Sequence, residues 1–172
     1  MSHVIWFTGL SGAGKTSTSQ ELVKMLTHPC VQLDGDVLRK GLCSDLGFSD
    51  EHRRENIRRT GEVAKLMCDA GLTVIVACIT PFARDRRWLR ELLGIRYVEV
   101  FCDCPLTVCE KRDVKGLYKK ARSGEIPAFT GISSPYEPPD NPHIVLHTAQ
   151  GTPEDGARKI VEYMQQNANT VQ

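Results

Sequence analysis

The chain has 172 residues, of which 41% are apolar and 25% charged, and 22 basic residues against 21 acidic ones leave a net charge of +1. This length and composition predict one globular domain, residues 1–172, with a sizeable core. The near-neutral charge provides no field that favours nucleic acid or a membrane surface, so neither is expected as a partner. No apolar run approaches the ~18 residues of a membrane-spanning helix, and the chain enters a strand-like run without room for a signal peptide. We therefore expect a cytoplasmic protein.

A short apolar run at residues 3–8 predicts a buried strand, and the spacing of residues 17–26 predicts a helix. Between them, residues 9–16 read GLSGAGKT, a complete G-x-x-x-x-G-K-[ST] phosphate-binding loop. A strand, a glycine-rich turn and a helix N-terminus in this order favour a nucleoside triphosphate, because backbone N–H groups can turn inward around a phosphate. The predicted ATP-binding residues here are Gly9, Leu10, Ser11, Gly12, Ala13, Gly14, Lys15 and Thr16.

Strands and helices then alternate along the chain. Apolar and β-branched runs predict strands at residues 31–33, 72–79, 97–102 and 143–147. Helical spacing and end signals predict helices at residues 37–42, 50–70, 84–93, 105–111 and 153–166, followed by a frayed polar tail at 167–172. This alternation predicts an α/β protein with the three-layer P-loop kinase fold, in which helices flank a parallel sheet.

Residues 113–142 have a different character. They are polar and basic, and they hold Pro127, Pro135, Pro138, Pro139 and Pro142 out of the nine prolines of the chain. Long, mostly irregular segments within compact domains usually serve function. We expect a lid segment here.

The chain has seven cysteines, an odd number, and their spacing contains no C-x-x-C pair. Cys102 and Cys104 flank Asp103 but lack partners at zinc spacing. Cys78, like Cys102, lies in an apolar run, where a cysteine acts as a small hydrophobic side chain. We expect free structural thiols in a reducing cytosol, with a redox-regulated pair as the alternative.

Two aspartates follow the strand at 31–33, at the edge of the sheet where ligands of parallel sheets bind. One of Asp34 and Asp36 can orient Mg²⁺, and the other can accept the proton of an attacking hydroxyl. The alternative is that each is an ordinary turn aspartate beside Gly35. Arg39, one helical turn beyond Asp36, can hold an anionic substrate.

The start of the long helix predicts a second binding region. Phe48 can stack on a base, or it can pack into the core as a hydrophobic staple. Arginines are dense over residues 53–59, and Arg53 shares a helix face with Asn56. Although a charge run is usually a solvated face, this one favours a site for a second anion.

The lid segment supplies further candidates: Lys115, Lys119, Lys120, Arg122 and Phe129. Closing over a bound nucleotide, they would exclude water that otherwise hydrolyses the triphosphate. The alternative for the basic residues is a solvated helix. Arg112 precedes the lid at a place where P-loop kinases often set a guanidinium over adenine, so we include it among the ATP-binding residues.

Together these motifs resemble the adenylylsulfate kinase family, whose members use ATP to phosphorylate the 3′-hydroxyl of adenosine 5′-phosphosulfate. The likeness extends from Trp6 to about Thr148. It rests on the blocks 9–16, 34–39, 46–49, 53–59, 115–122 and 129–132, in that order. Many families share the phosphate loop, whereas the ordered combination is specific.

The resemblance implies roles for the matching residues. The catalytic set would be Lys15, Asp34, Asp36 and Thr80, with Thr16 and Asp34 at the Mg²⁺ that accompanies ATP. Phe48 and Phe129 would sandwich the adenine of adenylylsulfate. The full substrate-binding set would be Asp36, Arg39, Phe48, Arg53, Asn56, Ile79, Thr80, Lys115, Ala128 and Phe129. The resemblance also implies a homodimer, an association with ATP sulfurylase and a place in sulfate assimilation.

Two departures from the family pattern affect these expectations. The family usually has serine where Thr80 stands, and that serine has been proposed as a phosphorylated intermediate; we interpret Thr80 as a substrate contact. The family lid usually reads G-E-I-K-G-F, and Pro127 and Ala128 replace its lysine and second glycine. This predicts a stiffer, less basic lid.

Other functions are also considered. The altered lid makes a kinase of the same fold, acting on another nucleotide with a modified phosphate, the second interpretation. A GTP-binding switch needs an N-K-x-D element, which the sequence lacks. A non-catalytic nucleotide-binding module is disfavoured by the intact Lys15, Asp34 and Asp36.

Overall fold

The computed structural model describes residues 1–168 and contains one five-stranded sheet in the order β2-β3-β1-β4-β5. Every neighbouring pair of strands is parallel, which confirms the predicted α/β class. The strands are β1 (Val4–Thr8), β2 (Cys30–Asp34), β3 (Thr73–Ala77), β4 (Tyr97–Asp103) and β5 (Ile144–His147).

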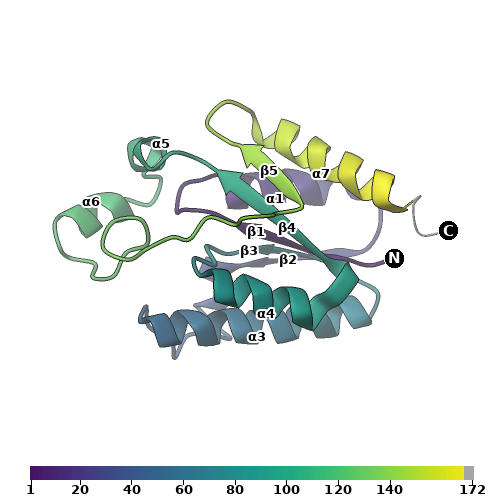
Figure 1. Ribbon diagram of the computed structural model, residues 1–172, viewed down its shortest axis with the longest axis horizontal. Coiled ribbons are helices and arrows are strands. Elements are labelled where there is room, and N and C mark those ends of the chain that lie inside the picture. Colours follow the sequence, from purple (N-terminus) through teal and green to yellow (C-terminus); the bar gives the residue numbers. More distant parts are fainter. Residues whose placement is uncertain (169–172) are drawn as a thin grey trace.

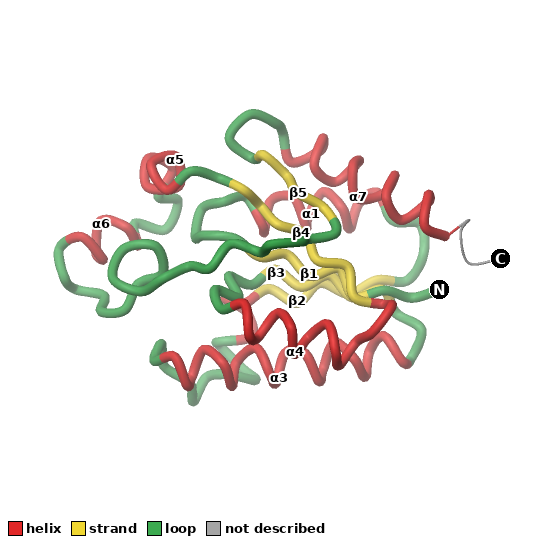
Figure 2. The backbone as a smooth tube through the Cα atoms, in the orientation of Figure 1, coloured by secondary structure: helices red, strands yellow, loops and turns green. Residues whose placement is uncertain are grey.

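Helices cover both faces of the sheet, with α1 and α7 on one side and α3 and α4 on the other (Figures 1 and 2). The helices are α1 (Lys15–Met25), α2 (Gly35–Leu38), α3 (Asp50–Asp69), α4 (Ala83–Leu93), η1 (Gly94–Arg96), α5 (Leu106–Arg112), α6 (Leu117–Arg122) and α7 (Pro153–Ala168). The segment with α5 and α6 extends beyond the carboxyl ends of the strands, at the left of Figure 1. Among the described residues, no helix combines the length and apolarity needed to cross a membrane.

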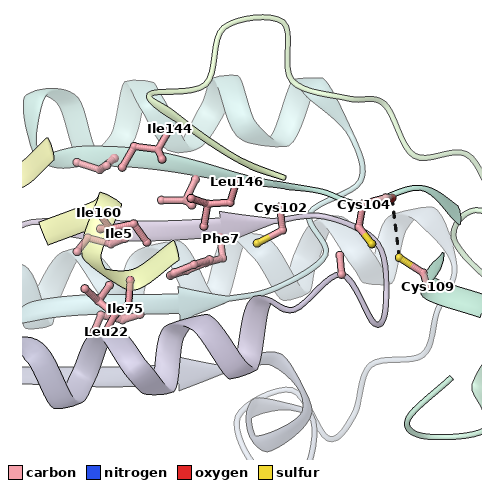
Figure 3. Packing of buried hydrophobic residues seen from close by; sticks show 14 of the residues in the cluster. Ile5, Phe7, Leu22, Ile75, Cys102, Cys104, Cys109, Ile144, Leu146 and Ile160 are labelled. Carbon is pink, nitrogen blue, oxygen red and sulfur yellow. Dashed lines mark hydrogen bonds between the residues drawn. The ribbon is translucent and has the colours of Figure 1, made fainter. Parts of the chain in front are cut away.

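Alternate residues of β1 supply the two layers of the core. Ile5 and Phe7 pack with Leu22 of α1 (Figure 3), and Trp6 belongs to a second cluster with Leu89 of α4. All of these side chains are completely buried. Burying one such side chain contributes about 1.5–3 kcal/mol, so the central strand is a main source of stability.

The cysteines are part of this packing. All seven are free, and all except the half-buried Cys30 are buried. Cys102, Cys104 and Cys109 lie together beside the phosphate loop (Figure 3). Burial raises the pKa of the Cys102 and Cys109 thiols to about 12. These thiols therefore remain protonated near neutral pH and act as small hydrophobic groups.

Two local expectations are wrong in detail, and the mostly irregular lid segment includes one short helix. Helix α2 begins at Gly35 rather than residue 37, because the Asp34 carboxylate accepts a hydrogen bond from the Asp36 N–H and caps the turn. The lid segment contains α6, whose first N–H groups donate to the Asp113 carboxylate. Helix α7 continues to Ala168, beyond the expected start of the tail. The rest of the predicted tail, 169–172, lies outside the described residues.

Candidate active site

A cavity of about 970 Å³ lies at the carboxyl ends of the strands. It is lined by the phosphate loop, the ends of β2 and β3, the start of α3 and the lid segment. Segments far apart in the sequence thus form one site, as expected for an open parallel sheet. The size suits small-molecule ligands.

The phosphate loop is fixed by close backbone packing. Gly9 has φ +151°, and a Cβ there would lie 2.8 Å from the carbonyl oxygen of Cys102. A side chain at this position would therefore displace β4. The Gly9 N–H donates to the carbonyl of Ile79 at 3.3 Å, which joins the loop to the segment that follows β3. Helix α1 starts at Lys15, so its N-terminus adds positive potential to the loop.

Lys15 is held inside this loop. Its Nζ donates to the carbonyl oxygens of Gly9 and Leu10 at 2.9 and 2.7 Å. Burial lowers the pKa of Lys15 below its ordinary value of 10.5. A half-buried ammonium whose hydrogen-bond partners are carbonyl oxygens is strongly attractive to a phosphate.

Thr16 and Asp34 bring two oxygen donors together. The Thr16 hydroxyl donates to Oδ2 of Asp34 at 2.8 Å. Mg²⁺ prefers such oxygen donors and usually relies on one or two protein groups plus substrate phosphates. Among the described residues, no group of three or more His, Cys, Asp and Glu side chains forms a protein metal cage. The oxygen donors of Thr16 and Asp34 are of the kind that Mg²⁺ binds alongside substrate phosphates.

Asp36 lines the cavity and forms an ion pair with Lys115 of the lid segment. Arg39 donates to the carbonyls of Leu46 and Gly47. Its guanidinium lies 4.3 Å from the centroid of the Phe48 ring. Phe48 is 55% exposed and lines the cavity, so the alternative of a core staple is wrong.

Arg53 and Asn56 share the cavity-facing side of α3, as the helical spacing predicts. Arg53 donates to the Phe48 carbonyl at 2.9 Å, the Thr130 hydroxyl at 2.8 Å and the Ala128 carbonyl at 2.5 Å. The Oδ1 atom of Asn56 is buried without a hydrogen-bond partner among the described residues. Arg53 thus links α3 to the lid, and Asn56 retains an unused polar atom at the cavity.

The lid turn packs more deeply than expected. Phe129 lines the cavity but is only 8% exposed, with its ring edge-on to Tyr118 at 5.0 Å. The Tyr118 hydroxyl donates to the Ser11 carbonyl at 2.8 Å and fixes α6 to the phosphate loop. Ala128 does not line the cavity; it has φ +54° and offers its carbonyl to Arg53. The structure therefore brings Phe129 to the site and leaves the Ala128 side chain out of it.

Ile79 and Thr80 form the wall beyond β3. Thr80 is 1% exposed, has φ +48°, and its hydroxyl accepts a hydrogen bond from Nε1 of Trp6 at 2.8 Å. The hydroxyl is thus directed to the core. It retains one hydrogen to donate.

Arg112 lines the cavity beside the phosphate loop. Its guanidinium donates to the carbonyls of Gly12 and Thr148 at 3.1 and 2.6 Å. Lys119, Lys120 and Arg122 do not line the cavity, and Arg122 pairs with Glu110 on α5. For these three basic residues the solvated-helix alternative describes their positions better.

Sequence reasoning missed several lining residues. Tyr118 and the turn after β5, Thr148 with 151–153, belong to the cavity. The turn could have been predicted to line the cavity, because it follows a predicted strand at its carboxyl end, where the other motifs also lie. Tyr118 carried no signal, because its contact with the phosphate loop depends on the path of the lid.

A family model described as "Adenylylsulphate kinase" matches residues 1–147. The chain belongs to the adenylylsulphate kinase family. It is 54% identical over 167 residues to the adenylyl-sulfate kinase of Clostridium acetobutylicum, covering 95% of this chain and 84% of that protein. The adenylyl-sulfate kinase of Acaryochloris marina is 52% identical over 170 residues, which cover 96% of this chain and 83% of the relative.

The fold agrees with this family assignment. The APS kinase of Mycobacterium tuberculosis, solved in complex with AMPPNP and APS, superposes with a TM-score of 0.92 at 45% identity. The match covers 95% of this chain and 98% of that one. The adenylylsulphate kinase assignment thus rests on sequence and structure over nearly the whole chain.

Proposed function

We propose that this protein transfers the γ-phosphate of ATP to the 3′-hydroxyl of adenylylsulfate, yielding 3′-phosphoadenylylsulfate for sulfate assimilation. One observation carries the proposal: a single cavity is lined both by residues of the phosphate loop and by Asp36, Arg39, Phe48, Arg53 and Asn56. A transferase of this kind needs a triphosphate and a second, aromatic and anionic ligand facing each other.

The phosphate-loop side is the proposed ATP site. Residues 9–16 surround the phosphates, and Arg112 lies beside the adenine. Lys15 neutralises the negative charge on the phosphate oxygens of ADP, the leaving group. Thr16 and Asp34 would hold Mg²⁺, which when bound neutralises charge on the triphosphate. The oxygen donors of Thr16 and Asp34 support this assignment.

The second group of lining residues is the proposed acceptor site. Asp36 accepts a hydrogen bond from the 3′-hydroxyl and receives its proton as the oxygen attacks the γ-phosphorus in line; the bond from the γ-phosphorus to the bridging oxygen breaks, and ADP leaves. Phe48 and Phe129 flank the adenine, Arg53 and Asn56 bind the phosphosulfate, and Arg39 supports Phe48. Ile79, Thr80 and Lys115 complete the site, and Thr80 acts as a wall because its hydroxyl is directed toward Trp6.

The chain is proposed to be one P-loop kinase domain, with residues 113–142 as its lid. The lid excludes water during transfer, which prevents hydrolysis of ATP. Its stiffness follows from Pro127 and from anchors at Tyr118 and Arg53. We further propose a cytoplasmic homodimer that associates with ATP sulfurylase.

The second candidate is a kinase of the same fold whose acceptor is another nucleotide with a modified phosphate. Pro127 and the left-handed Ala128 in the lid turn favour this alternative. A coupled assay of ADP release, run with adenylylsulfate and a panel of such nucleotides, separates the two. We expect adenylylsulfate at micromolar concentration to stimulate ADP release and to have the highest kcat/KM. A higher kcat/KM for another nucleotide would favour the alternative.

A further inference from the structure

A buried ion pair lies next to Thr80, which with Ile79 forms the cavity wall beyond β3, called here the acceptor wall. Arg86 of α4 and Glu99 of β4 are 4% and 2% exposed, and Nε of Arg86 lies 3.2 Å from Oε1 of Glu99. Arg90, whose side chain is 45% exposed, donates to the other carboxylate oxygen of Glu99 at 2.8 Å. A buried ion pair adds little net stability compared with apolar residues of the same shape. This pair therefore suggests a role other than holding the fold together.

The Arg86 guanidinium also joins two distant segments. Nη1 donates to the Thr80 carbonyl at 2.8 Å, and Nη2 donates to the Glu137 carbonyl at 2.5 Å. The Glu137 N–H donates to the Pro81 carbonyl at 2.8 Å, and Oε2 of Glu137 accepts from the Ala83 N–H at 2.6 Å. The cavity wall at Thr80 and Pro81 is thus fastened to the stretch that returns from the lid beside α4 (Figure 1).

Thr80 needs this support because its backbone is strained. A left-handed φ of +48° at a β-branched residue costs about 1–2 kcal/mol. Such a conformation persists where the surroundings determine it from several sides. Trp6 holds the hydroxyl of Thr80 and Arg86 holds its carbonyl, while the Thr8 hydroxyl donates to the carbonyl of the preceding residue, Ile79, at 2.6 Å.

We propose that Arg86 is a positioning residue for the acceptor half of the site. It does not line the cavity, so it acts through Thr80 and Glu137, keeping the wall and the base of the lid in fixed relation. The inference rests on the proposed function, since it concerns the adenylylsulfate side. A lysine preserves the charge opposite Glu99. Its single ammonium cannot replace the planar guanidinium, whose two terminal nitrogens donate to the carbonyls of Thr80 and Glu137.

The test compares Arg86→Lys with Arg90→Lys, a matched control. Arg90 lies on the same helix and pairs with the same Glu99, yet it contacts neither Thr80 nor Glu137. We expect Arg86→Lys to raise the KM for adenylylsulfate about tenfold, because small displacements of positioning groups have large effects, and to leave the KM for ATP within about twofold. We expect Arg90→Lys to leave both constants within about twofold of the wild type.

A second readout needs no substrate. Amide hydrogen exchange at Ala83 and Glu137, in the ligand-free protein, should accelerate in Arg86→Lys and stay unchanged in Arg90→Lys. Absence of adenylylsulfate-dependent activity in the wild type would refute the proposed function, whereas the exchange rates still decide whether Arg86 joins the two segments. Unchanged exchange, or equal rises in KM for both substrates, would overturn the positioning role.

Glu137→Ala covers the case in which Arg86→Lys does not fold. It removes only the exposed carboxylate that accepts from Ala83 and leaves no buried charge unpaired. We expect a smaller rise in the KM for adenylylsulfate, about two- to threefold, with faster exchange at Ala83. The Glu137 carbonyl that accepts from Arg86 is kept in this variant, so a wild-type KM together with wild-type exchange would contradict the connection between the cavity wall and the returning stretch through which Arg86 is proposed to act.

Discussion

Lys115 and Asp36, 79 positions apart in the sequence, form an ion pair between the lid segment and α2. Both side chains are more than half exposed, at 52% and 60%. The carboxylate that we propose as the base is thus already in contact with the lid. Binding of an acceptor hydroxyl to Asp36 therefore involves a rearrangement of Lys115.

Lys115→Ala should affect catalysis much more than stability. An exposed ion pair contributes about 0–1 kcal/mol, which shifts the melting temperature by at most ~4 °C in a chain of this size. The kcat/KM for adenylylsulfate should fall about tenfold or more, because a cation beside the reacting groups is lost. Lys119→Ala, outside the cavity, is the control. Equal activity in the two variants would refute a role for Lys115 at the acceptor.

Asp36→Asn should lower kcat about 10²–10⁴-fold, since the amide cannot take the proton of the 3′-hydroxyl. Binding of a non-hydrolysable ATP analogue, measured by calorimetry, should not change. Asp45→Asn is the control, because Asp45 pairs with Arg59 and does not line the cavity. If Asp36→Asn retained wild-type ADP release with adenylylsulfate, Asp36 would not be the base.

Ala128→Gly should stabilise the protein. Ala128 has φ +54°, where the Cβ destabilises the folded protein by about 1–2 kcal/mol. Glycine removes this strain, but its greater freedom in the unfolded chain lowers the stability by about 0.4–1 kcal/mol. The expected net gain in the free energy of unfolding is about 0.5–1 kcal/mol, measured by urea denaturation.

Gly124→Ala is the reverse experiment in the same lid turn. Gly124 has φ +82°, and a methyl group added there would have no neighbour within 4 Å among the described residues, so only backbone strain changes. We expect a loss of about 1 kcal/mol. A loss of stability in Ala128→Gly, or a gain in Gly124→Ala, would show that conformation does not govern this turn.

ATP affinity should begin to fall at a lower pH than it would if Lys15 had the ordinary lysine pKa of 10.5. Burial places the pKa of Lys15 in the ligand-free protein below 10.5, and a bound triphosphate raises it by supplying negative charge. Binding is then coupled to proton uptake above the lowered pKa, so affinity decreases as pH rises through it. Calorimetric titration of an ATP analogue across alkaline pH checks this. An affinity that stays constant up to pH 10.5 would contradict it.

The phosphate loop and the parallel sheet could be predicted because their signals are local. The glycine spacing of residues 9–16 specifies a backbone shape, and the apolar runs specify buried strands. The sharing of one cavity by Asp36, Arg53 and Asn56 followed from the rule that ligands bind at the carboxyl ends of parallel strands.

The lid and the support behind the acceptor wall could not be predicted in the same way. The burial of Phe129 against Tyr118 and the left-handed Ala128 depend on the path of the whole lid. The contact of Arg86 with Thr80 and Glu137 joins three distant segments. One signal was present: Glu99 interrupts an apolar strand, and a buried carboxylate needs a cationic partner.

The most direct test of the proposed function follows the labelled γ-phosphate of ATP in the presence of adenylylsulfate, with the 3′-deoxy analogue as the matched control. We expect transfer of the label to the 3′-oxygen of adenylylsulfate and no transfer to the analogue, which competes for the same site. Label on the analogue, or no label on adenylylsulfate while another nucleotide is phosphorylated, would contradict it.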